Sequence, residues 1–101
     1  MTTIEEVAST PSRQAIEETL MACLDEVLGP DILEVMNVDG QTRVFTDIGL
    51  SSIDIVRVAE LIVKHYPAAD QLVMWVADRP PTEIVRITVD DIVGYIADVC
   101  R

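Results

Sequence analysis

Residues 47–66 read DIGLSSIDIVRVAELIVKHY, and this stretch decides the fold. At about 100° per residue, most of its apolar side chains fall on one arc of a helix and its charged side chains fall on the opposite arc. The apolar arc consists of Ile55, Val56, Val58, Ala59, Ile62, Val63 and Tyr66. The serine pair Ser51-Ser52 precedes this pattern and Pro67 follows it, as expected at the two ends of a helix. The stretch therefore predicts an amphipathic helix from Ser51 or Ser52 to Tyr66, with one face against a core.

Two further stretches have helical spacing. The first begins after Pro11 and ends at Gly29, a residue type that commonly terminates helices. The second runs from Thr88, a natural N-cap with Asp91 three residues on, to Cys100. Their apolar positions are Ile16, Leu20, Cys23, Leu24 and Val27 in the first, and Ile92, Val93, Ile96 and Val99 in the second. This spacing predicts two more long helices that share a core with the first.

The segment between the first two helices is irregular. Residues 31–50 predict a long loop, with a short turn of helix at 31–35 and apolar anchors at Val44 and Phe45. Loops of this length are uncommon in compact domains unless they have a function. The loop therefore counts toward a specialised architecture.

The segment before the last helix leaves one alternative open. Residues 68–78 are mainly apolar and predict either a short helix or an extended lid, because periodicity cannot separate the two at this length. Trp75 is expected to cover the core as part of such a lid, with contact to a partner as the alternative. Residues 82–86 predict a helix of one or two turns.

The whole pattern predicts an all-α domain over residues 11–101, with three long helices, one short helix and a long first loop. Residues 1–10 have no clear apolar face and are expected to form a flexible leader. A chain of 101 residues supports one modest core and no second domain. We expect a monomer, because the apolar arcs can bury against one another.

The charge excludes several kinds of partner. Eighteen acidic and seven basic residues give a formal net charge of −11, which repels nucleic acid and anionic membrane surfaces. No apolar run approaches the ~20 residues of a membrane span, and the first residues do not resemble a signal peptide. We therefore expect a cytoplasmic protein. Cys23 and Cys100 lack metal-ligand spacing and are expected to be plain structural thiols.

The serine pair predicts a division of roles at the start of the central helix. Ser51 fits the N-cap, and Asp54 can complete a capping box with it. Ser52 is then the first helical residue and keeps a free hydroxyl. The amides and the dipole at a helix N-terminus favour an attached phosphate by roughly 0.3 to 1 kcal/mol. Gly49 permits the tight turn into the helix.

These residues resemble the attachment motif of acyl and peptidyl carrier proteins. In that family an aspartate, an apolar residue, a glycine and two further residues precede a modified serine, which is followed by Leu, Ile or Met. The matching residues here are Phe45, Asp47, Gly49, Ser52, Ile53, Asp54 and Val56. The start of the last helix, Thr88 to Val93, is also similar to the family's usual final helix. The resemblance extends over most of residues 12–101.

The resemblance implies a four-helix bundle of the acyl-carrier type and a non-catalytic carrier function. A 4′-phosphopantetheine arm from coenzyme A would be joined to Ser52, and its thiol would hold the cargo as a thioester. The supporting motif residues are Asp47, Gly49, Ser51 and Asp54. The implied partners are a phosphopantetheinyl transferase, enzymes that load the cargo, and downstream biosynthetic enzymes. Their expected contacts are Leu50, Ile53, Arg57 and Lys64.

The chain departs from the family pattern in ways that bear on the pathway. Ser51 stands where many carriers have aspartate, although the spacing from Gly49 favours Ser52 as the modified residue. Arg57 and Lys64 lie on a helix face that is typically acidic in fatty-acid carriers, which favours polyketide or other specialised biosynthesis. The form of the motif favours an acyl cargo, with an aminoacyl cargo in nonribosomal peptide assembly as the alternative.

Two other functions are weighed against a carrier. An enzyme that uses Ser52 would need a base, but His65, the single histidine, lies about 20 Å further along a continuous helix at ~1.5 Å per residue. A helical module that is never modified and works only by docking is the stronger alternative. Such a module has no need of Asp47, Gly49 and Ile53 around the serine, so the carrier is favoured.

Overall fold

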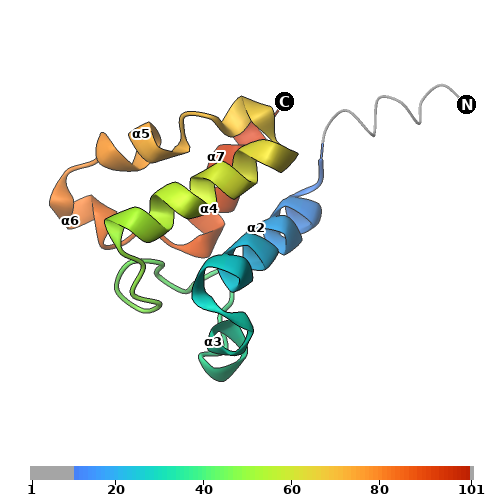
Figure 1. Cartoon of the computed structure of the whole chain (residues 1–101). Coiled ribbons are helices and arrows are strands. Elements are labelled where there is room, and N and C mark those ends of the chain that lie inside the picture. The colour runs from blue at the N-terminus through green and yellow to red at the C-terminus, as the bar shows by residue number, and fades with distance from the viewer. Residues whose placement is uncertain (1–10, 101) are drawn as a thin grey trace, which may run out of the picture.

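The computed structural model describes residues 11–100 and is all-α (Figure 1). Its long helices are α2 (Arg13–Leu28), α4 (Ser52–His65) and α7 (Val89–Val99), as the sequence predicts. The shorter segments are α3 (Pro30–Val35), a 3-10 turn η1 (Pro67–Ala69), α5 (Leu72–Ala77) and α6 (Pro81–Ile84). Within this part of the chain the only β-pairing is an isolated bridge between Arg43 and Thr88. The expected leader, residues 1–10, lies outside the described residues.

Helix α2 begins and ends where its sequence predicts. The Ser12 hydroxyl caps its start by accepting a hydrogen bond from the Ala15 amide at 3.1 Å. Gly29, at φ 103°, ends it and donates its N–H to the Asp25 carbonyl at 2.7 Å. The chain then turns directly into α3, with Pro30 in the first helical position.

Helix α4 is the central element of the domain. It packs against α2, which runs in the opposite direction, while α2 also packs against α7 (Figure 1). Ile55, Val58, Ala59 and Ile62 form its buried face. The helix ends at His65, one residue earlier than predicted, and Tyr66 is its C-cap because the following proline cannot continue the ladder of hydrogen bonds.

The core is built from aliphatic side chains of the long helices and of the segments between them. Fully buried residues include Ile16, Leu20, Leu24, Val44, Val58, Ile62, Leu72, Ile87, Val89, Ile92 and Ile96. No polar or charged residue in residues 11–100 is buried in this core. Burial raises the pKa of the Cys23 thiol, and the charge of Glu26 raises it further, so this thiol stays protonated at neutral pH.

The loop before α4 is tied to the start of α7. The Val89 amide donates to the Thr42 carbonyl at 3.0 Å, and the Asp90 amide donates to the Gly40 carbonyl at 2.9 Å. The loop thereby satisfies amides in the first turn of α7 that lack partners inside the helix. Val44 is buried beneath these bonds, so the predicted anchoring role of this residue is confirmed.

The segment between α4 and α7 contains several short helical pieces rather than one. Prolines at positions 67, 80 and 81 divide it, since proline favours the first turn of a helix and interrupts an existing one. The alternative left open for residues 68–78 is settled in favour of helix, by α5. Helix α6 begins at Pro81, one residue earlier than predicted.

Trp75 of α5 contacts the domain itself. Its ring lies 5.0 Å from the Tyr95 ring of α7, and the Arg79 guanidinium lies over it at 4.3 Å from the centroid. These contacts agree with the prediction that Trp75 covers the core.

Candidate functional site

Ser51 and Asp54 form the capping box predicted from the sequence. The Ser51 hydroxyl accepts a hydrogen bond from the Asp54 amide at 3.1 Å. In return, the Asp54 carboxylate accepts one from the Ser51 amide at 3.0 Å. The hydroxyl of Ser51 is therefore engaged in holding the end of the helix.

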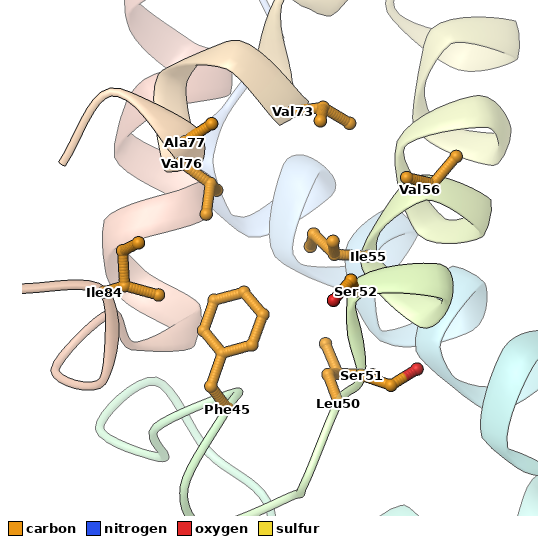
Figure 2. A pocket seen from close by; sticks show the side chains of 10 residues that line it. All are labelled: Phe45, Leu50, Ser51, Ser52, Ile55, Val56, Val73, Val76, Ala77 and Ile84. Carbon is orange, nitrogen blue, oxygen red and sulfur yellow. The ribbon is translucent and has the colours of Figure 1, made fainter. Parts of the chain in front are cut away.

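The hydroxyl of Ser52, in contrast, takes no part in the helix cap. It is exposed, and its hydroxyl makes no hydrogen bond with any residue in the described range 11–100. Figure 2 shows the Ser52 oxygen directed toward a pocket and the Ser51 oxygen directed away from it. The two neighbouring hydroxyls thus differ both in their engagement and in the direction in which they point.

The turn before the serines is held by Asp47. Its carboxylate accepts a hydrogen bond from the Arg43 amide at 3.0 Å, and its own amide donates to the Arg43 carbonyl at 2.9 Å. The Leu50 amide then donates to the Val44 carbonyl at 3.0 Å, which returns the chain to the core. Asp47 therefore has a structural role, because it fixes the loop from which α4 starts.

Gly49 occupies a backbone conformation that other residues adopt at a cost. Its φ is +86°, and a Cβ atom added there would have no other atom within 4 Å. The glycine is thus required by backbone strain rather than by crowding. This turn directs the chain from the Asp47 loop into α4.

Gly49→Ala and Gly94→Ala are expected to change stability in opposite directions. Gly49→Ala should lower the free energy of unfolding by about 1–2 kcal/mol, because alanine is strained at positive φ. Gly94 lies within α7, where an added Cβ would meet only the Arg13 guanidinium at an ordinary 3.6 Å. Gly94→Ala should therefore raise stability by roughly 0.5–1 kcal/mol through helix propensity. Urea unfolding of both variants measures the difference, and equal effects would contradict the role assigned to Gly49.

An apolar pocket of about 520 Å³ lies beside Ser52 (Figure 2). Helices α4, α5 and α6 and the loop before α4 contribute its walls. The lining residues are Phe45, Leu50, Ser51, Ser52, Ile55, Val56, Val73, Val76, Ala77 and Ile84. The two serines are the only polar side chains among them. The pocket can accept an apolar group that reaches it from the Ser52 side.

The sequence did not assign Val73, Val76, Ala77 and Ile84 to the site. These residues come from α5 and α6, which are distant from Ser52 in the sequence and approach it only in the folded chain. For the three residues of α5, the apolar character of residues 68–78 was the only available signal, and it did not indicate which surface they would line.

The residues predicted to contact partners do not share one environment. Ile53 is 72% exposed beside Ser52, and Arg57 and Lys64 are exposed further along α4. Leu50 is only 5% exposed, so its prediction as a surface contact is wrong. The hydrogen bond between the Leu50 amide and the Val44 carbonyl draws this residue inward, and its side chain joins the core.

Two acidic side chains line the same groove as Arg57. A shallow groove of about 150 Å³ between α2 and α4 is lined by Glu26, Val27, Arg57, Glu60 and Leu61. The charge of Arg57 is therefore partly offset by its two acidic neighbours. Lys64 lies in the last turn of α4, where a cation also interacts favourably with the helix dipole.

The arrangement does not support catalysis by Ser52 with His65. Helix α4 is continuous from Ser52 to His65, so the two residues are separated by about 20 Å along the helix axis at ~1.5 Å per residue. Residues 11–100 contain no group of three or more His, Cys, Asp or Glu side chains that could hold a metal ion. In the same range, no helix is long and apolar enough to cross a membrane.

Comparisons with known proteins give no relative for this chain: no family model, no curated protein and no solved structure matches it.

Proposed function

We propose that this protein carries acyl groups as thioesters on a 4′-phosphopantetheine arm attached to Ser52, in the manner of the acyl carrier proteins that its motif resembles. The observation that carries the proposal is the Ser52 hydroxyl. Ser52 is exposed, and its hydroxyl makes no hydrogen bond within residues 11–100 and points toward an apolar pocket. Its neighbour Ser51 supplies the cap, so Ser52 can be modified without loss of the helix end.

The local backbone suits a phosphodiester at Ser52. The amides of Ser52 and Ile53 make no hydrogen bond in the described part of the chain, because they belong to the first turn of α4. A phosphate joined to the serine oxygen would lie near these amides and near the positive end of the helix dipole. The arm would supply a terminal thiol for the thioester, and the protein would position it.

The pocket favours an acyl cargo over an aminoacyl cargo. Its walls offer aliphatic side chains and the Phe45 ring, with no charged group to receive an ammonium ion. An aliphatic chain would be stabilised by burial there, at about 25 cal/mol per Å² of apolar surface removed from water. A charged amino group would lose its hydration without compensation.

The surroundings of Ser52 support partners outside primary fatty-acid synthesis. Ile53 offers an apolar contact directly beside the modified residue, and Arg57 and Lys64 add cations on the outer part of α4. We place the protein in polyketide or other specialised biosynthesis, with a broad-specificity transferase for its modification. The long helices α2, α4 and α7, with shorter segments between them, are compatible with a carrier-type four-helix bundle.

The test is the intact mass of the purified protein after incubation with coenzyme A and a broad-specificity phosphopantetheinyl transferase. We expect the mass to increase by one phosphopantetheinyl unit in nearly all molecules. A carrier protein of known competence, treated in parallel, shows that the transferase is active. An unchanged mass beside a fully modified control would reject the proposal and favour a module that acts by docking alone.

The cargo is tested separately, and this experiment starts from the unmodified protein, whose Ser52 hydroxyl can still receive an arm. Transfer of preformed acyl and aminoacyl phosphopantetheine from the corresponding coenzyme A thioesters gives both loaded forms. We expect an acyl chain to protect the backbone amides of Val56 and Val76 from hydrogen exchange, because both residues line the pocket. Equal protection by both cargoes would contradict the preference for acyl groups.

A further inference from the structure

Helix α3 presents an apolar face to solvent. Val35 is 77% exposed, and Ile32 and the adjoining Met36 are 39% and 41% exposed. Figure 1 shows α3 at the end of α2, outside the group formed by α2, α4 and α7. These side chains do not contribute to the core that stabilises the fold.

The three residues have the spacing of a helix that binds in a groove. Ile32, Val35 and Met36 stand at positions i, i+3 and i+4, which lie on one side of a helix. Amphipathic helices that dock into apolar grooves use anchors at this spacing. The three side chains therefore form one contact face, which we call the α3 face.

The charge around the α3 face defines its occupant. Residues 29–42 contain Asp31, Glu34 and Asp39 and no Lys, Arg or His. All three residues are exposed: Asp31 and Glu34 lie on α3 itself, and Asp39 lies in the following loop, where its carboxylate accepts hydrogen bonds from Gln41 and Thr42. A partner that buries this face must bring its own cations close to these carboxylates. An acidic rim on the partner would repel the carboxylates, and a neutral rim would remove their water without replacing it.

We propose that the α3 face docks into an apolar groove with a basic rim on a partner protein. The same charges argue against two other occupants. A second copy of the chain would bring a net charge of −11 against another −11, and residues 1–10 carry Glu5 and Glu6 without any basic side chain. The partner is therefore a different protein, and its groove is lined by apolar residues with Lys or Arg at the edge.

The α3 face is separate from the site at Ser52. None of its three residues lines the pocket beside Ser52. The end of α2 that leads into α3 and the beginning of α4 lie at the same end of the molecule, because these helices run in opposite directions (Figure 1). A partner held by the α3 face would thus lie toward the end of the molecule at which α4 begins, and docking itself does not require an arm on Ser52.

Photo-crosslinking identifies the partner, and three variants then test the interface. Benzoylphenylalanine is placed at position 35 of the full chain in the producing cells, or at position 85 as a control. Val85 is a suitable control because it is also an exposed valine outside the long helices. The protein captured specifically from position 35 is identified by mass spectrometry and purified. Calorimetry then measures the binding of this partner to the wild type and to three variants, Val35→Asp, Val85→Asp and Ser52→Ala.

We expect Val35→Asp to weaken binding by about tenfold or more, and Val85→Asp to change it by less than about twofold. Binding should weaken as salt is raised, and it should be unchanged in Ser52→Ala. Because Val35 is exposed, the thermal midpoint of Val35→Asp should match that of the wild type. No specific adduct at position 35, an adduct with a second copy, or loss of binding in Ser52→Ala would each overturn the proposal. The Ser52→Ala result also distinguishes docking from the carrier function, because this variant should bind the partner although it cannot receive an arm. The carrier function has its own test, and it is rejected if the wild type takes up no phosphopantetheine.

Discussion

Ser52→Ala is expected to take up no phosphopantetheinyl group under conditions that modify the wild type completely, whereas Ser51→Ala should still be modified. The reason lies in the difference between the two hydroxyls. The oxygen of Ser51 holds the Asp54 amide at 3.1 Å, and the oxygen of Ser52 has no partner in residues 11–100 and faces the pocket. Intact mass measured after incubation with coenzyme A and the transferase checks both variants.

The stability of the two variants provides the control, because Ser51→Ala, which should still be modified, is expected to be the less stable of the two. Ser51→Ala removes the N-cap and should lower the free energy of unfolding by about 0.5–2 kcal/mol. Ser52→Ala removes no hydrogen bond and places a better helix former in the first turn, so its stability should be equal to that of the wild type or slightly higher. A folded Ser52→Ala protein that is still modified would move the attachment site to another residue. Loss of modification in a folded Ser51→Ala protein would assign the attachment to Ser51.

Ile62→Ala is expected to lower the free energy of unfolding by about 2–5 kcal/mol. Ile62 is fully buried in the face of α4 that packs against the core. Its truncation removes apolar contacts and leaves a cavity that the surrounding aliphatic side chains cannot fill completely. Small domains have about 5–15 kcal/mol of stability, so this one change should remove a large share of it. Urea or thermal unfolding followed by circular dichroism measures the loss.

Ile53→Ala is the matched control, because it is the same substitution in the same helix at an exposed position. It should change stability by less than about 0.5 kcal/mol. The pair thus separates the buried face of α4 from the face that we expect partners to contact. A loss of similar size in both variants would show that Ile53 supports the fold and is not free to contact a partner.

The parts of the structure that the sequence predicted are those set by local interactions. The capping boxes at Ser51 and Thr88 each need only residues three positions apart, and both form as predicted. The long helices could be predicted because the spacing of apolar residues within each segment is enough to indicate a helix. The turn at Gly49 is also local, since its positive φ depends on the glycine itself.

The parts that could not be predicted depend on contacts between distant segments. The pocket requires α5 and α6 to approach the start of α4, and apolar composition alone does not reveal that approach. Leu50 was expected to contact partners, which requires an exposed side chain. Its burial depends on the Val44 carbonyl, which turns the chain inward, and no local pattern indicates that bond.

The hydrogen bonds between the Gly40–Thr42 carbonyls and the first amides of α7 have a consequence for the order of folding. Residues 89 and 90 leave the ribosome long after the loop that they hold. Until then, the segment before Ser52 has only its local hydrogen bonds, those between Asp47 and Arg43 and between Leu50 and Val44, and it lacks the bonds that tie it to α7. Newly made chains should therefore complete the loop that precedes Ser52 only after α7 has been synthesised and has docked, so the modification proposed for Ser52 should follow synthesis of the domain rather than accompany it.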